Sequence, residues 1–148
     1  MLDIDPLRDG VAPLPAATVV VLRPAQTGFE AFLVQRTRGA AFMGGAYVFP
    51  GGKLDASDVA PTVLARAEGL DAAEAARRLG EDDGERALGL FIAAVRETLE
   101  EAGVLVGSSR RGVAAADVRA RLLGGTAFLA LADELDLSLA VTRLVPLS

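Results

Sequence analysis

Apolar residues recur at helical spacing over the residues that lead up to Gly103. They lie three and four positions apart, which is the pattern of a helix that packs one face onto a core. These positions are Leu88, Phe91, Val95, Leu99 and Ala102. Asp82 and Asp83 suit the positive end of such a helix, and Gly103 suits the left-handed residue that ends it. We therefore predict one long helix with a buried face and an acidic face.

Valine-rich and alternating segments in the first third of the chain predict strands. Residues 17–23 are expected to form a buried strand and residues 29–36 a second one. Turn residues lie between them, so we expect the two strands to pair as a hairpin. Phe42 and Met43, in the loop that follows, are expected to cover the core.

Helix signals continue through the second half of the chain. Asp71 with Glu74 three residues later predicts the start of a helix over 72–79, and Gly80 ends it. Beyond Gly103 we expect a strand at 104–106, helices over 114–123 and 126–135, and a last strand at 140–145. Together these elements predict an α/β protein of the α+β type, with residues 1–148 forming one domain that is long enough for a hydrophobic core.

The composition narrows the chemistry that is open to the chain. The 148 residues carry a formal net charge of −5 and include neither cysteine nor histidine. The acidic balance argues against a nucleic-acid partner held by a basic surface. The missing residue types exclude thiol and imidazole nucleophiles and zinc sites built from these side chains. Catalysis would therefore use carboxylates, arginine, lysine, hydroxyl groups or a bound metal ion.

The sequence also argues against a membrane partner. The first ten residues carry acids where a secretory signal carries basic residues, and no apolar run approaches the ~20 residues that span a bilayer. We therefore expect a cytoplasmic protein.

Three glutamates share one face of the predicted long helix. Glu97, Glu100 and Glu101 stand at positions i, i+3 and i+4, so their carboxylates are able to converge. The negative end of the helix dipole disfavours a carboxylate by roughly 0.3–1 kcal/mol. Like charges four residues apart add about 0.2–0.5 kcal/mol. A divalent metal ion would offset both effects, and the alternative is a set of ordinary solvated glutamates on a surface helix.

Two further features favour the metal-site interpretation. Phe49 and Pro50 open into Gly51 and Gly52, and a double glycine permits the close approach that side chains would block. Arg96 precedes Glu97 directly and is placed to orient a carboxylate by a charge-assisted hydrogen bond. The alternative for Arg96 is a surface ion pair that contributes at most about 1 kcal/mol.

Residues 96–104, which read RETLEEAGV, resemble the signature of the Nudix hydrolases. Thr98 is the one departure, at a position where the family has an aliphatic residue. The first half of the signature is matched by Gly52 and, after five residues, by Asp58 in place of a glutamate. A contiguous signature would place its arginine at position 66, and Arg96 lies 30 residues further on. Arg66 is not directly followed by a glutamate and is interpreted as a coincidence.

The split signature resembles the branch of the family that includes coenzyme A diphosphatases. The resemblance implies a Nudix-type α/β/α sandwich with a mixed sheet and a helical insertion at 59–85, which we expect to cap the site. This family's sheet normally continues after the last predicted strand. We therefore expect either a missing C-terminal segment or a second copy of the chain, in a homodimer, to complete it.

The resemblance also implies the roles of the site residues. The catalytic set would be Arg96, Glu97, Glu100 and Glu101, with the three glutamates holding Mg²⁺ or Mn²⁺. Arg36 and Arg38 would bind substrate phosphates, although a role as exposed charges at a strand end is an equal alternative. Gly51 and Gly52 would shape the loop beside the glutamates, and Asp55 and Asp58 would be secondary members of the site. Glu134 and Asp136 are the candidates for the general base.

The expected reaction is hydrolysis of a phosphoanhydride in a small diphosphate compound. Coenzyme A or acyl-coenzyme A is favoured by the resemblance, and nucleoside triphosphates, dinucleotide polyphosphates and nucleotide sugars are alternatives. Two other classes of function stay open. One is a Nudix-like module that binds a nucleotide without cleaving it, and the other is a helical interaction protein whose acidic face meets a basic partner.

Overall fold

The computed structural model describes residues 13–39 and 44–147. The predictions for the amino-terminal acids and for Phe42 and Met43 lie outside these residues. In the described part of the chain, no helix combines the length and the apolar character needed to cross a membrane.

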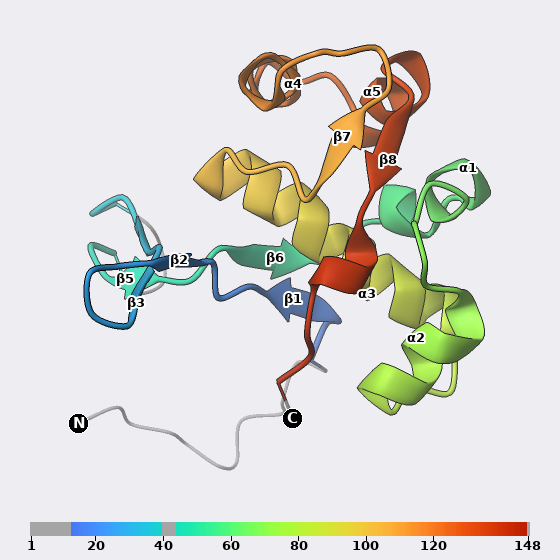
Figure 1. The fold of residues 1–148 in the computed structure, drawn as a ribbon, viewed down its shortest axis with the longest axis horizontal. Coiled ribbons are helices and arrows are strands. Elements are labelled where there is room, and N and C mark those ends of the chain that lie inside the picture. The colour runs from blue at the N-terminus through green and yellow to red at the C-terminus, as the bar shows by residue number, and fades with distance from the viewer. Residues whose placement is uncertain (1–12, 40–43, 148) are drawn as a thin grey trace.

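Helix α3 (Gly84–Glu97) runs through the middle of the fold, and the other elements surround it (Figure 1). Asp83 caps it by accepting a hydrogen bond from the Arg86 amide over 3.1 Å, which confirms the predicted acidic start. The helix continues into a π-helical turn, η2 (Thr98–Ala102), and ends at Gly103 with φ at +70°. The predicted end is therefore confirmed, whereas the wider last turn was not expected.

Burial around α3 extends beyond one face. Ile92, Ala93 and Ala94 are buried together with the predicted apolar positions 88, 91 and 95. The reason is that α2 (Ala72–Leu79), the strands β1 (Ala16–Thr18) and β6 (Gly51–Lys53), and the 3₁₀ helix η1 (Ala56–Val59) all pack against it. The prediction of a single buried face is thus wrong for this part of the helix.

The strands pair in short antiparallel ladders. In addition to β1 and β6 they are β2 (Leu22–Pro24), β3 (Phe29–Ala31), β4 (Val34–Gln35), β5 (Tyr47–Val48), β7 (Gly107–Ser109) and β8 (Leu137–Leu139). Strand β1 pairs with β6, β2 with β3, β4 with β5 and β7 with β8. A parallel bridge joins Ala67 to Leu139. The α+β class is confirmed, in the form of small sheets with helices around them.

The predicted first hairpin is confirmed, but its strands are not buried. Leu22 pairs with Ala31 and Pro24 with Phe29, and Gly28 adopts φ +77° in the turn. Leu22 is 55% exposed and Phe29 72% exposed. The hairpin and β5 lie to one side of the helical core (Figure 1), so the expectation of a buried strand over 17–23 is wrong.

The helices of the second half confirm the sequence pattern, and two strands are displaced from their predicted places. Helix α2 begins after Asp71 and ends at Gly80, and two further helices follow as α4 (Ala115–Leu123) and α5 (Phe128–Glu134). The strands predicted at 104–106 and 140–145 form instead at β7 and β8. Gly107 decides this register, because a Cβ at that position would overlap the main-chain oxygen of Ser138.

The hydrophobic core lies between α3, α5, β8 and the short helix α1 (Pro61–Leu64). Its fully buried side chains include Val63, Ile92, Leu131 and Leu139. This core fixes α3 in place, and the π-helical turn at its end reaches the side of the molecule that carries β6 (Figure 1).

Candidate functional site

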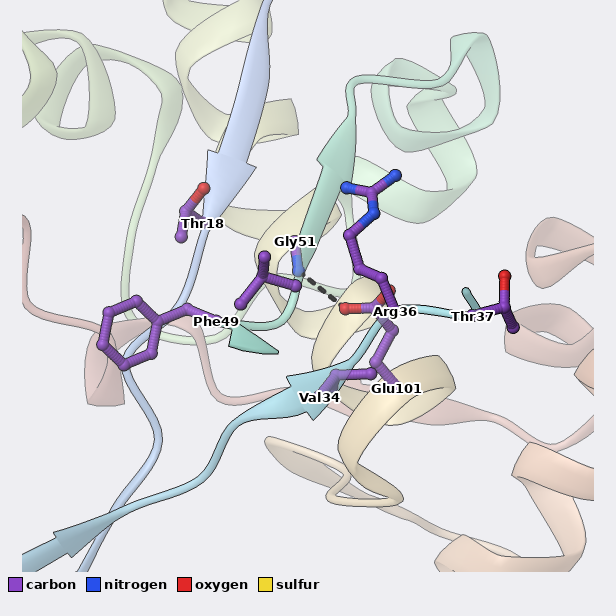
Figure 2. A pocket seen from close by; sticks show the side chains of 8 residues that line it. Thr18, Val34, Arg36, Thr37, Phe49, Gly51 and Glu101 are labelled. Atoms are coloured by element: carbon purple, nitrogen blue, oxygen red, sulfur yellow. Dashed lines mark hydrogen bonds between the residues drawn. The ribbon is translucent and has the colours of Figure 1, made fainter. Parts of the chain in front are cut away.

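The two separated motifs meet where η2 approaches β6. The main-chain amide of Gly51 donates a hydrogen bond to Oε2 of Glu101 over 3.0 Å (Figure 2). These residues are 50 positions apart in the chain. The structure thus joins the double-glycine loop to the glutamates of the helix end.

The double glycine is required because the site has no room for side chains. A Cβ at Gly52 would overlap the carboxylate of Glu97, and a Cβ at Gly51 would overlap the main chain of Ala17 and Thr18 on the paired strand. Gly52 therefore lets Glu97 lie against the backbone of β6.

We expect Gly52→Ala to lower about tenfold the rate of the hydrolysis predicted from the sequence, because the added methyl group displaces the Glu97 carboxylate from its position. Steady-state kinetics on the purified variant measure this. Gly39→Ala is the control, since a Cβ at Gly39 meets no atom of residues 13–39 and 44–147 within 4 Å. Equal rates for Gly52→Ala and the unmodified protein would contradict the close-approach argument.

Arg96 connects the two halves of the site through its hydrogen bonds. Its Nε and Nη2 each donate to one oxygen of Asp58 over 2.9 Å, and Nη2 also donates to the carbonyl of Lys53 over 3.0 Å. Its Nη1 donates to Glu97 over 2.6 Å and to Glu100 over 3.2 Å. The Arg96 side chain is only 10% exposed. The alternative of a plain surface ion pair is therefore wrong, and Arg96 orients two of the three glutamates.

Asp58 is the principal partner of Arg96, a role beyond the secondary one predicted from the sequence. Its side chain is fully buried, and Oδ2 also accepts a hydrogen bond from the Asp55 amide over 2.8 Å. The Asp55 side chain in turn accepts from the Ser57 amide, so the two aspartates form a capping box around η1. The short aspartate side chain suffices here because η1 places it directly against the guanidinium.

Thr98 fits an aliphatic position because its hydroxyl group is satisfied locally. The side chain is 1% exposed, and Oγ1 donates to the carbonyl of Ala94 over 2.7 Å. A buried hydroxyl without a partner would destabilise the helix, whereas this bond to the preceding turn removes that cost. The departure from the family pattern therefore leaves the helix packing intact.

The electrostatic environment of the site follows from the burial of Glu97 and Arg96 beside further carboxylates. Burial raises the pKa of the Glu97 carboxyl, and the charges of Glu100 and Glu101 add to this although Arg96 opposes it. Burial lowers the pKa of the Arg96 guanidinium, but hydrogen bonds and charges from Asp58 and Glu97 outweigh it and raise the pKa above its ordinary value. The site thus concentrates more negative than positive charge.

The carboxylate oxygens of the three glutamates are the kind of ligand that a hard divalent cation prefers. Their side chains are held by different partners. Within residues 13–39 and 44–147, no three acidic side chains are grouped closely enough to enclose a metal ion. Glu97 and Glu100 share Nη1 of Arg96, while Glu101 is turned to the Gly51 amide. Mg²⁺ takes oxygen ligands, retains several waters and uses substrate phosphates as further ligands. This donor set fits such an ion without an all-protein cage.

A pocket of about 440 Å³ opens beside Glu101. It is lined by polar and apolar side chains from the β-strands and by the site itself: Thr18, Val34, Arg36, Thr37, Val48, Phe49, Gly51 and Glu101. Figure 2 shows Arg36 and Phe49 on different sides of the Gly51–Glu101 contact. Arg36 is therefore among the lining residues of this pocket and Arg38 is not, while the binding of phosphate by either residue stays a prediction.

The two candidates for a general base are engaged elsewhere. Both carboxylate oxygens of Glu134 accept from Arg121, over 2.8 and 2.6 Å, and the hydrogen bonds from Arg121 lower the pKa of Glu134. Asp136 accepts from Arg66 over 3.0 Å. Neither carboxylate lines the pocket beside Glu101. Arg66 joins α5 and β8 to the segment after α1 and takes no part in the glutamate site.

The chain is similar to a solved structure of a known family. No family model matches this chain. Among solved structures, the chain is similar to a NUDIX hydrolase from Alicyclobacillus acidocaldarius, with a TM-score of 0.65 and 32% sequence identity. The match covers 86% of this chain and 57% of that one, so the chain spans little more than half the length of its neighbour.

Proposed function

We propose that this chain is a hydrolase of the Nudix type, a metal-dependent enzyme that cleaves the phosphoanhydride of a small diphosphate compound, and its similarity to a NUDIX hydrolase supports this. The observation that supports this most strongly is the contact network of Arg96. That residue joins Asp58 of the first half of the signature to Glu97 and Glu100 of the second half. A surface helix with ordinary solvated glutamates would not bury such an arginine.

Glu97, Glu100 and Glu101 would hold Mg²⁺ or Mn²⁺ in this proposal. When bound, such an ion supplies electrophilic polarisation of the diphosphate and lowers the pKa of a bound water. The chain's own residues supply orientation: Arg96 holds Glu97 and Glu100, and the Gly51 amide holds Glu101. Each ligand is therefore fixed by a neighbouring group, as in metal sites whose outer partners set ligand direction.

The pocket beside Glu101 is the place where the substrate would bind. Arg36 offers a guanidinium for a phosphate group, and Phe49 offers an apolar surface for the remainder of the molecule. Coenzyme A or acyl-coenzyme A is the favoured substrate, because the long separation between Gly52 and Arg96 resembles the coenzyme A diphosphatases. Both the diphosphate and the bulky organic part of such a compound match this lining.

We expect Arg36→Ala to raise KM about tenfold with a small change in kcat, because one charge-assisted hydrogen bond to a phosphate contributes roughly 1.5–3 kcal/mol. Initial rates over a range of substrate concentrations separate the two constants. Arg38→Ala is the matched control, since Arg38 lies two residues away, is exposed and does not line the pocket. Equal changes in KM for the two variants would exclude a specific role of Arg36.

A screen of diphosphate compounds tests the proposed function directly. The purified chain is incubated with Mg²⁺ and, separately, with coenzyme A, an acyl-coenzyme A, a nucleoside triphosphate, a dinucleotide polyphosphate or a nucleotide sugar, and released phosphomonoesters are scored. We expect hydrolysis that requires the metal ion, with the highest kcat/KM for a coenzyme A compound. Binding by calorimetry without turnover of any compound would overturn the proposal in favour of a binding module.

A further inference from the structure

Arg119 on α4 contacts the turn that carries the glutamates. Its Nε donates a hydrogen bond to the main-chain carbonyl of Glu100 over 2.9 Å. The residue is half-buried, and α4 packs against η2. This contact links a helix outside the signature to the end of the helix that presents Glu100 and Glu101.

The Glu100 carbonyl needs a donor because it lies in the last turn of the helix. The Gly103 amide donates to the carbonyl of Leu99 over 3.1 Å, and the Val104 amide donates to that of Thr98 over 3.4 Å. The Glu100 carbonyl is among the last four of the helix, which have no amide partner within it, because the chain leaves the helix at Gly103. Arg119 supplies the donor, as basic side chains near a helix C-terminus do when they bind its last carbonyls.

The positive charge of Arg119 stabilises the turn in addition to its hydrogen bond. The negative end of the helix dipole repels the nearby carboxylates at this turn. A cation placed at the carbonyl end offsets that repulsion. Arg119 therefore stabilises a turn whose glutamates would otherwise favour a looser arrangement.

We propose that Arg119 is a positioning residue that fixes the main chain of η2 at Glu100, and thereby directs Glu101 to the Gly51 amide and Glu100 to Arg96. Without Arg119, the Glu100 carbonyl loses its side-chain donor, and the turn is no longer fastened to α4 at this point. The carboxylates of Glu100 and Glu101 then lose their fixed direction relative to β6. The consequence for catalysis rests on the proposed function, whereas the consequence for the Gly51–Glu101 contact does not.

The structural test is hydrogen exchange at the Gly51 amide, measured by NMR on the metal-free protein. In Arg119→Met we expect this amide to exchange about tenfold faster, the factor that corresponds to loss of one net hydrogen bond. Arg121→Met is the matched control, because it removes the same charge from the same helix and breaks only the ion pair with Glu134. Its Gly51 exchange should equal that of the unmodified protein.

The kinetic test compares kcat and KM for the same variants. We expect Arg119→Met to lower kcat about tenfold with KM changed less than twofold, the size of effect typical for residues that orient metal ligands. Arg119→Lys should recover most of the loss, since lysine also donates to a carbonyl. Arg121→Met should behave like the unmodified protein.

The outcomes separate this inference from the proposed function. Unchanged Gly51 exchange in Arg119→Met overturns it, even if kcat falls, because the effect would not pass through the turn. Global unfolding of Arg119→Met, with Arg121→Met folded, overturns it as well, because Arg119 would then be a general stabiliser. A chain that hydrolyses no diphosphate refutes the proposed function, while Gly51 exchange still decides the role of Arg119.

Discussion

Glu101→Gln is expected to abolish Mg²⁺-dependent hydrolysis while leaving the fold intact. Glutamine retains an oxygen that can accept the hydrogen bond from the Gly51 amide, so the contact between η2 and β6 survives. The substitution removes the negative charge that a metal ion requires from its ligand. Metal-ion polarisation supplies several kcal/mol of transition-state stabilisation, and each 1.4 kcal/mol corresponds to a tenfold rate. We therefore expect the rate to fall at least about 100-fold.

The measurement combines steady-state rates at saturating Mg²⁺ with a thermal unfolding curve. Glu85→Gln is the control, because Glu85 lies exposed in the first turn of the same helix, at the end opposite the site. It should keep its activity. Full residual activity in Glu101→Gln would refute the assignment of Glu101 as a metal ligand, and a large drop in unfolding temperature would show that its role is structural.

Asp58→Asn is expected to lower the free energy of unfolding by about 3–5 kcal/mol. The substitution leaves the guanidinium of Arg96 buried without its main counter-charge, and breaking a buried ion pair from one side has a cost of this size. The remaining contacts of Arg96 with Glu97 and Glu100 do not replace the bidentate pair. Urea denaturation of both proteins under the same conditions gives the difference.

Asp55→Asn is the matched control for this prediction. Asp55 caps η1 through the Ser57 amide, and asparagine is an equally good cap, so the free energy of unfolding should change by less than about 1 kcal/mol. A double variant, Asp58→Asn with Arg96→Met, should lose less stability than the two single variants together, because the buried charge is removed. A loss below 1 kcal/mol for Asp58→Asn would contradict the buried-pair argument.

Local signals in the sequence were sufficient to predict the four longer helices, whereas the short helix α1 was not predicted. Asp83 and Gly103 mark the ends of the long helix because capping and the left-handed end depend on a few neighbouring residues. The same holds for α2 between Asp71 and Gly80. The hairpin turn at Gly28 also follows from local backbone preference.

The strands after Gly103 show where such signals fail. The apolar stretches at 104–106 and 140–145 carry a strand pattern, yet pairing occurs at β7 and β8. The close approach of Gly107 to the main chain of Ser138 selects that register, and it involves segments about 30 residues apart. Periodicity within either stretch contains no information about this contact.

The sequence by itself therefore determined the candidate residues for the chemistry: Arg96, the three glutamates and the double glycine. Only the tertiary structure decided how they are held: the buried pair of Arg96 with Asp58, the Gly51–Glu101 contact, and the hydrogen bond from Arg119 to a π-helical turn. The physical reason is the separation along the chain of the residues that interact. Helix ends and turns follow from interactions among adjacent residues, whereas a buried charge acquires its partner only when packing brings distant segments together.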